Sequence, residues 1–440
     1  MTHPAVCPPQ YLGTLSLASV RTSTGGPMGT TLTPDPAVRG RRRLRWGVAG
    51  VGVALVGQVV VLALWPAAHL LMIDLQVYRA GGEHVLHGEP LYAGGVLLDL
   101  PFVYPPFAAA VLAPLALLPL GVLKVVWTAA GLGLLGFVVH RCARSVGVPA
   151  GSAFRATLLL TALATCLDPV RTTLYLGQIN IVLLAVVVAD LLGRRDSRWR
   201  GVGVGVAAAV KLTPLVFVAY LLFTGRRRAA ATASGAFAAA AGIGFLVAPA
   251  NSAAYWFDGT FADADRISGV ASAANHSLNG LLARLGSHAI LPWLVGALVL
   301  GALTVWVAVR AHRAGEEVLA LTLCGLASAA LAPFAWSHHW VWVVPLLVLL
   351  AHRAMAGHPA AVALLIGVLA CTFAVVTALP GPGVGPIPST GLISLQPDTY
   401  LLLFLAVLAG SGRWLRMTPR FSIGKSAAGE ISSSGGAAAR

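Results

Sequence analysis

Charged residues are scarce in this chain. Only 10% of its 440 residues are charged, whereas soluble domains carry about 25%. Hydrophobic residues make up 57% of the chain, and they fall in runs of about 17 to 25 residues, each long enough to cross a bilayer as a helix. A lipid-exposed backbone must satisfy its own hydrogen bonds, which favours helices. The sequence therefore excludes a soluble globular domain and predicts an all-α polytopic membrane protein.

Several motifs of soluble enzymes are also missing. The chain has neither a G-x-x-x-x-G-K-[ST] phosphate loop nor a nucleotide-binding G-x-G-x-x-G after a strand, and no soluble segment large enough to bind a sugar nucleotide. His338 and His339 are adjacent but have no nearby Asp, Glu or Cys, so they are a weak metal signal. The cysteines form no C-x-x-C pair, and we expect from them neither a metal site nor a disulfide framework. They are Cys7, Cys142, Cys166, Cys324 and Cys371.

Acidic residues are half as frequent as basic ones. The chain has 30 Lys and Arg against 15 Asp and Glu, a formal charge of +15. In a soluble protein this excess would suggest a nucleic acid partner, but here the arginines cluster between apolar runs, as they do in cytoplasmic loops. We therefore expect no nucleic acid partner. The arginines at 39–45 precede the apolar run 46–69, which predicts a cytoplasmic N-terminus and an external loop at 70–104.

These signals divide the chain into three regions. Residues 1–45, rich in Pro, Thr, Ser and Gly, are expected to be a disordered cytoplasmic tail. Residues 46–415 form the membrane domain, and residues 416–440 a second disordered cytoplasmic tail. Within the membrane domain, segments 105–119 and 201–223 are expected to be broken or hairpin helices that line a cavity.

The other apolar runs predict single crossings. Together with the two interrupted segments they give about ten to twelve transmembrane helices. The crossings are expected near 46–69, 122–140, 156–172, 178–192, 229–248, 290–309, 318–334, 340–351, 359–379 and 400–412.

The first external loop concentrates acidic residues. It contains Asp74, Glu83, Glu89 and Asp99. Asp74 opens a short helical pattern that can lie at the membrane surface, where lipid headgroups are. Two interpretations remain open: Asp74 caps this helix, as Asp often does, or it is a functional carboxylate.

The remaining polar clusters in apolar sequence all fall on the predicted external face. Polar residues near hydrocarbon are costly and often mark function. Gln178 and Asn180, in LGQIN, can alternatively form hydrogen bonds between helices. The histidines of WSHHW, His338 and His339, can alternatively be a polar pair beside an interfacial belt of tryptophans. A further cluster is ANHSLNG, which contains Asn275 and His276.

Lys211 interrupts the apolar run VAAAVKLTPLVFV. It lies about ten residues from either basic end, which carries it roughly 15 Å into the bilayer at 1.5 Å per residue. A snorkelling lysine is one explanation. The alternative is a cation in a broken helix, since Pro214 follows closely, and a lipid-linked phosphate would be its partner.

In these motifs the chain resembles the actinobacterial membrane mannosyltransferases that use polyprenyl-phosphate mannose, within the GT-C superfamily. The resemblance covers roughly residues 46–415. It rests on the order and spacing of DLQVYR, GEPLY, FVYPPF, LGQIN, AAAVKLTP, NHSLNGLLARL and WSHHW. It is strongest to the α-(1→2)-mannosyltransferases of phosphatidylinositol mannosides, lipomannan and lipoarabinomannan.

The resemblance implies a GT-C fold with a catalytic first external loop. It implies that Asp74 is the catalytic base of an inverting transfer and that Lys211, His338 and His339 recognise the donor phosphate. The partners would be a polyprenyl-phosphate sugar, a mannosylated glycolipid or glycan acceptor, and membrane lipids. No cofactor is required, and a divalent metal is left open. The expected substrate-binding residues are Tyr78, Arg79, Tyr104, Gln178, Asn180, Asn275 and His276.

Three alternatives remain open from sequence. Related arabinofuranosyltransferases share much of the pattern, so the donor could be polyprenyl-phosphate arabinose. A lipid-linked sugar transporter or flippase would use Lys211 and the broken helices as a substrate path, but the chain lacks inverted repeats and its polar clusters lie on one side. A non-catalytic scaffold would leave Asp74 unexplained.

Overall fold

The computed structural model of the chain describes residues 71–194, 197–263, 269–374 and 397–417. All of them belong to one unit, Gly47–Arg440. The predicted tail 1–45, the predicted crossing 46–69 and residues 418–440 lie outside this part of the chain. The fold is mostly helical, as predicted.

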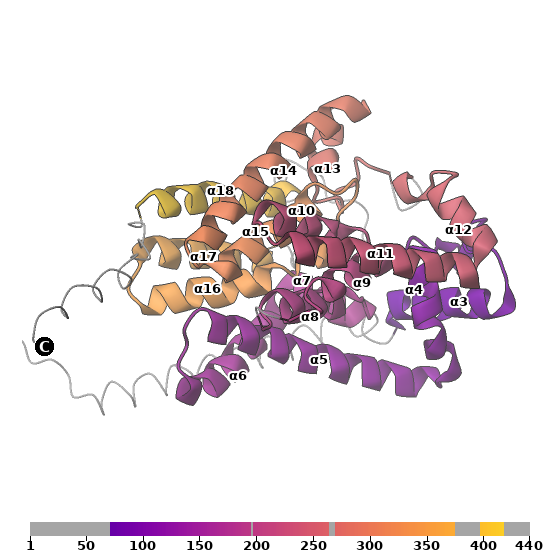
Figure 1. Cartoon of the computed structure of the whole chain (residues 1–440), viewed down its shortest axis with the longest axis horizontal. Helices are drawn as coiled ribbons and strands as arrows, with labels where there is room; N and C mark the ends of the chain where they lie inside the picture. Colours follow the sequence, from indigo (N-terminus) through magenta and orange to yellow (C-terminus); the bar gives the residue numbers. More distant parts are fainter. Residues whose placement is uncertain (1–70, 195–196, 264–268, 375–396, 418–440) are drawn as a thin grey trace, which may run out of the picture. The chain divides into compact units, whose positions relative to one another are not determined.

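The helices follow the apolar runs of the sequence, and one small antiparallel hairpin interrupts them. The labels are those of Figure 1. The elements are α3 (Ile73–His87), β1 (Gly95–Leu97), β2 (Leu100–Pro101), α4 (Pro106–Leu112), η1 (Ala113–Leu117), α5 (Leu120–Ser145), α6 (Ala150–Cys166), α7 (Asp168–Leu176), α8 (Asn180–Leu191), α9 (Val202–Val210), η2 (Thr213–Leu215), α10 (Val216–Phe223), α11 (Arg227–Val247), α12 (Pro249–Trp256), η3 (Thr260–Ala262), α13 (Leu278–Arg284), α14 (Ile290–Arg313), α15 (Glu317–Ala330), η4 (Ser337–Trp340), α16 (Val343–Met355), α17 (Pro359–Ala374) and α18 (Thr399–Met417).

The bundle contains two kinds of helix, long apolar ones and shorter ones whose side chains are mostly buried. Among the described residues, α5, α11 and α14 are each long and apolar enough to cross a membrane, and the bent pair α6 and α7 adds a fourth if the two helices form one broken span. Leu291 and Leu298 of α14 are exposed, which fits a surface that faces lipid. Most side chains of α8, α15 and α16 are instead buried and form the core.

One predicted crossing differs from the structure. Residues 156–172 were expected to form a single helix, but α6 ends at Cys166 and α7 starts at Asp168 with a bend of 77° between them. Leu167 has an extended backbone, and Pro169 lies in the first turn of α7. Proline is tolerated there because the first N–H groups of a helix have no partner within it. The break starts a new helix that runs to the cavity.

The segment 201–223 is broken as predicted. Helix α9 ends at Val210, Lys211 is extended with φ −151° and ψ 128°, and η2 then leads into α10. Pro214 within η2 cannot donate a backbone hydrogen bond, which favours the interruption. The break leaves Lys211 in non-helical backbone, which membrane proteins tolerate where it lines a cavity.

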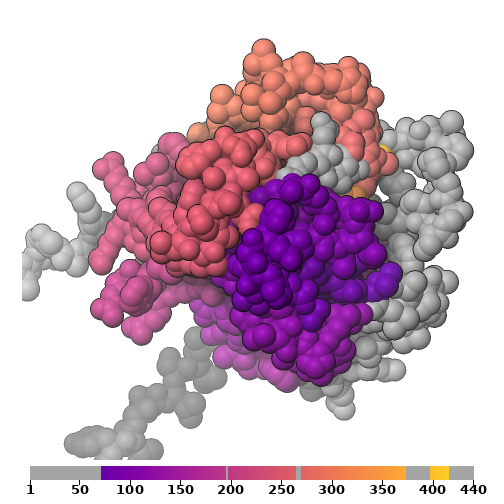
Figure 2. Space-filling model, turned by 90° about the vertical axis from the view of Figure 1, so that its right-hand side faces the viewer, coloured from indigo at the N-terminus to yellow at the C-terminus, as the bar shows by residue number. Residues whose placement is uncertain are grey.

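The predicted external loop 70–104 folds as a helix and a hairpin, and a second helix follows it. Helix α3 begins at Ile73 with Met72 as its N-cap, and it ends at His87 with Gly88, whose φ is 72°, as its C-cap. Helix α4 begins after Pro105 and tightens into η1. Figure 1 shows α3, α4 and α12 gathered at one end of the bundle. Figure 2 faces that end, where the indigo surface of α3 and α4 lies beside the rose surface of the segment that carries α12.

Candidate active site

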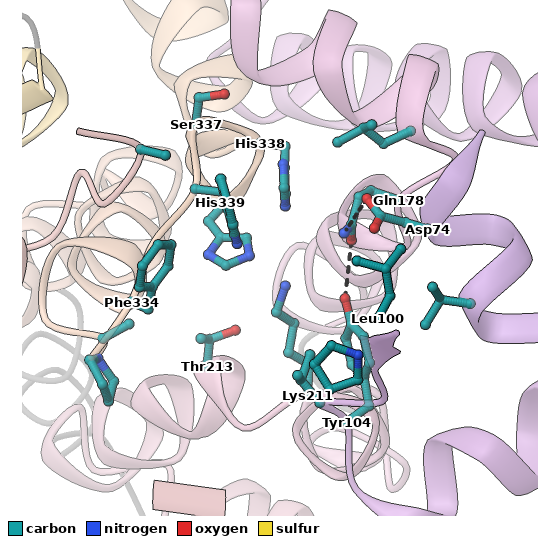
Figure 3. A pocket seen from close by; sticks show the side chains of 18 of the residues that line it. Asp74, Leu100, Tyr104, Gln178, Lys211, Thr213, Phe334, Ser337, His338 and His339 are labelled. Atoms are coloured by element: carbon teal, nitrogen blue, oxygen red, sulfur yellow. Dashed lines mark hydrogen bonds between the residues drawn. The ribbon is translucent and has the colours of Figure 1, made fainter. Parts of the chain in front are cut away.

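A cavity of about 750 Å³ opens beside the start of α3. Its walls come from α3, the loop after β2, the end of α7, the break at Lys211, residues within 255–263 and 272–276, and the residues around η4. Pockets of 300 to 1,000 Å³ are typical of small-ligand sites. In Figure 3, Asp74 and Gln178 lie across the pocket from His338 and His339, with Lys211 between them.

Asp74 lies in the first turn of α3 and lines the cavity. Met72, not Asp74, occupies the N-cap position of this helix. The carboxylate Oδ2 accepts a hydrogen bond from Gln178 Nε2 at 2.9 Å. Burial raises the pKa of Asp74 to about 6, and the Gln178 bond and the Lys211 charge oppose this shift. A carboxylate with such a pKa is ionised at neutral pH and yet basic enough to accept a proton during a reaction.

Gln178 is held by two phenols. Its Oε1 accepts hydrogen bonds from the hydroxyl of Tyr78 at 2.6 Å and from that of Tyr104 at 3.2 Å. The two hydroxyls lie 2.9 Å apart. Because Oε1 is occupied, the amide must turn Nε2, a pure donor, toward Asp74. The three residues thus fix the orientation of the carboxylate.

Backbone geometry brings Gln178 to α3. Helix α7 ends at Leu176, and its C-cap is Gly177, whose φ is 70°. A Cβ at this position would lie 2.6 Å from Leu75 Cβ. Only glycine combines this left-handed backbone with such a close approach to α3.

Lys211 directs its amine into the pocket (Figure 3). Its Nζ donates to Asn180 Oδ1 at 3.0 Å and lies 5.5 Å from the centre of the Tyr104 ring. No ion pair to Lys211 occurs within the described ranges. A cation with only neutral direct partners in a partly apolar site favours an anionic ligand.

The histidine pair sits in η4, between α15 and α16. The two rings lie 4.8 Å apart and nearly perpendicular, and Trp336 stacks on His338. His338 Nε2 and His339 Nδ1 are buried and have no hydrogen-bond partner in the described part of the chain. The backbone of His338 is fixed, since its carbonyl accepts from Asn180 Nδ2 at 2.9 Å and Thr173 Oγ1 at 3.3 Å.

Most of the residues predicted to form the site line this cavity together. The lining positions are Asp74, Tyr78, Tyr104, Gln178, Lys211, His276, His338 and His339.

Three predicted substrate-binding residues do not line it. Arg79 donates to the Ala116 carbonyl at 3.1 Å and pairs with Glu83 at 3.0 Å. Asn180 bridges Lys211 and the His338 carbonyl. Asn275 uses its amide on the backbone of its own loop and of 333–335. These side chains hold the walls in place.

Sequence reasoning overlooked several wall residues. Thr172 and Tyr175 line the cavity from α7, three residues apart. Trp336 lines it beside His338, although its sequence context suggested only an interfacial belt. The Asp-Pro step at 168–169 was an available signal for a helix start that would have placed Thr172 and Tyr175 on one face. Within the described ranges, no group of three or more His, Cys, Asp or Glu could hold a metal ion.

Comparisons with known proteins identify the family and several relatives of this chain. The family model of Glycosyltransferase family 87 matches residues 102–333. A polyprenol-phosphate-mannose-dependent α-(1-2)-phosphatidylinositol mannoside mannosyltransferase of Mycobacterium tuberculosis is 35% identical over 334 residues, 68% of this chain and 78% of the relative. Its namesake in Mycolicibacterium smegmatis is 37% identical over 359 residues, 74% of this chain and 78% of the relative.

A further relative differs in the acceptor that its name gives. It is a polyprenol-phosphate-mannose-dependent α-(1-2)-phosphatidylinositol pentamannoside mannosyltransferase of M. tuberculosis, 34% identical over 364 residues, 79% of this chain and 83% of the relative. No solved structure matches the chain.

Proposed function

The chain belongs to Glycosyltransferase family 87, and from this premise we propose that it transfers mannose from polyprenyl-phosphate mannose to a phosphatidylinositol mannoside, forming an α-(1→2) linkage. The observation that carries the proposal is the cavity in which Asp74 faces Lys211 and the histidine pair. It offers one base and a separate cationic and imidazole-lined wall. Such a division suits a donor that brings its own phosphate. The names of the relatives favour mannose over arabinose as the sugar.

Asp74 acts as the base in this proposal. The acceptor 2-hydroxyl gives its proton to the carboxylate while its oxygen attacks the anomeric carbon of the donor. The bond between that carbon and the phosphate oxygen breaks, and polyprenyl phosphate leaves with the electron pair. A β-linked donor then yields an α-mannoside by inversion, so one carboxylate suffices and no glycosyl-enzyme intermediate forms. General base catalysis of this kind contributes about 10²- to 10⁴-fold.

Lys211 and the histidines stabilise the leaving phosphate. The amine of Lys211 is held by Asn180 and directed into the cavity, where negative charge develops as the phosphate departs. A preorganised cation aimed at developing charge stabilises a transition state without reorganisation. The unpaired Nε2 of His338 and Nδ1 of His339 supply two further groups that can bind phosphate oxygens.

We place the cavity on the external face of the membrane. The basic loops at 141–155, 194–200, 226–228 and 310–313 are then cytoplasmic, in keeping with the bias of Lys and Arg toward that side. The lipid-linked donor and the lipid acceptor would both enter from the bilayer. Lipomannan and lipoarabinomannan precursors are further acceptors within the same proposal.

The proposal is tested with membranes that contain the chain. They are incubated with radiolabelled polyprenyl-phosphate mannose or, in parallel, radiolabelled polyprenyl-phosphate arabinose, together with phosphatidylinositol mannosides of defined length, and the product is analysed for linkage. We expect a new α-(1→2)-linked mannose. The matched control is the Asp74→Asn variant at equal abundance. Label transfer from the arabinose donor alone, or none from either donor, would contradict the proposal.

A further inference from the structure

A buried ion pair lies behind the cavity wall at the start of α7. Asp168 is 0% exposed and Arg171 is 1% exposed. Arg171 Nη2 donates to Asp168 Oδ1 at 2.8 Å. Neither residue lines the cavity, and the proposed reaction uses neither. A buried ion pair is costly to desolvate and is often no more stable than a well-packed apolar pair. Stability alone therefore explains the pair poorly.

The carboxylate of Asp168 joins two helices. Its Oδ1 also accepts from Thr172 Oγ1 at 3.0 Å, within α7, and its Oδ2 accepts from the hydroxyl of Tyr400 at 2.9 Å. Tyr400 lies in the first turn of α18, 232 residues away in sequence. Its ring stacks on Trp340 with centroids 5.4 Å apart and an angle of 19°. Asp168 thus ties the start of α7 to α18 and, through the ring, to η4.

Helix α7 connects the contacts of Asp168 to the cavity. Thr172 lines the cavity, and Gln178 follows immediately after the Gly177 cap. Thr173 of the same helix donates to the carbonyl of His338. One short helix therefore spans from the partner of Asp74 to the backbone of the histidine pair. A misplacement of about 1 Å in such a support can cost about 100-fold in rate.

We propose that Asp168 and Arg171 are positioning residues: by fixing α7 against α18 and η4, they set the distance between Gln178 and the histidine pair and so orient Asp74 for the transfer. This inference rests on the proposed function, because the transfer reaction is its readout. Tyr400 also belongs to this set of positioning residues, since its hydroxyl links the ion pair to α18.

The main test replaces the ion pair by apolar residues of similar volume. Replacing a buried ion pair often leaves stability unchanged, but here the buried hydroxyl of Tyr400 also loses its acceptor. Asp168→Leu combined with Arg171→Met should therefore reach normal abundance with a modest loss of thermal stability. We expect its kcat to fall by about 10-fold or more, since α7 loses its anchor. The Gln178 bond that lowers the pKa of Asp74 should weaken. The acid limb of the kcat/KM profile, expected near pH 6, should therefore move upward. A loss of folded protein alone would lower the rate without moving that limb.

A second variant covers the case in which the double replacement does not fold. Tyr400→Phe keeps the ring on Trp340 and removes only the hydroxyl that bonds Asp168. The same upward movement, smaller in size, is expected.

The matched control is an ion pair whose two residues do not line the cavity. Arg353 and Glu316 lie 2.8 Å apart with 13% and 31% exposure, and Arg353→Met with Glu316→Leu should leave the pH profile in place. A folded double variant of Asp168 and Arg171 with the parent kcat and profile would overturn the inference, as would an unmoved profile in Tyr400→Phe. Absence of transfer by the unsubstituted chain would instead overturn the proposed function.

Discussion

Replacement of Asp74 by Asn should make the protein less active and more stable. Asn retains a side-chain oxygen that can accept from Gln178 Nε2, so the local hydrogen bond survives. It cannot accept the proton of the acceptor hydroxyl. Turnover should therefore fall by about 10² or more, while donor binding through Lys211 and the histidines remains.

The gain in stability follows from the raised pKa. Burial moves the pKa of Asp74 from 3.8 to about 6. The folded protein therefore disfavours the ionised form, and this cost is present above the folded pKa and vanishes below the unfolded one. Asn removes this cost, so the free energy of unfolding should rise by about 3 kcal/mol at pH 7 and by about 1.5 kcal/mol at pH 5.

The assay is thermal unfolding of the purified protein in detergent at both pH values, beside transfer activity in membranes of equal protein content. The structure places Met72 and not Asp74 at the N-cap of α3, so the remaining alternative is a structural Asp74 without a role in the reaction. That alternative predicts near-normal activity in the Asn variant. An active Asp74→Asn variant, or one without added stability at pH 7, would refute the reasoning. Asp74→Glu is a useful companion because it keeps the base but moves it by one methylene.

Three further predictions concern the cavity and the topology. Lys211→Met should lower kcat/KM for the donor by about 10- to 100-fold, as expected for loss of one charge-assisted bond to the departing phosphate, and an unchanged kcat/KM would return Lys211 to a snorkelling role. Gln178→Leu should lower kcat and move the acid limb above pH 6, because it removes a bond that lowers the pKa of Asp74; Gln178→Glu should be worse, since it adds a second carboxylate. Gly94→Cys, at a position where a Cβ has open space, should react with an impermeant thiol reagent in intact cells, whereas Ser197→Cys should not. Each variant is measured against the unsubstituted chain, and labelling only at Ser197 would invert the topology.

The sequence predicted the helical architecture well where the bilayer imposes it. Apolar run length and basic loops placed α5, α11 and α14 within a few residues of their observed bounds, because hydrocarbon thickness fixes the length of a span. The break at Lys211 was also predicted, from a charge and a proline within one run. The break at Leu167 was not predicted, although Asp168 and Pro169 mark it in the sequence.

The sequence predicted which residues form the site better than it predicted the role of each one. The motifs identified Asp74, Gln178, Lys211 and the histidines, which the cavity brings together. Nothing in the sequence distinguished Gln178, whose amide faces the cavity, from Asn275, whose amide is used on backbone groups. Both are amides in short polar motifs, and which backbone groups lack partners depends on the tertiary fold. The same applies to Asp168, whose partner Tyr400 is 232 residues away.

Several of the polar side chains that line this cavity lie at helix interruptions. Gln178 follows the left-handed end of α7, Lys211 lies between α9 and η2, and the histidines lie in η4. Within a bilayer, backbone that leaves a helix must find partners in protein or face a cavity. Side chains at such breaks can approach a polar substrate from non-helical backbone. Because each break is visible as Gly, Pro or a charge inside an apolar run, the breaks in a related sequence indicate where its substrate lies, even where individual lining residues differ.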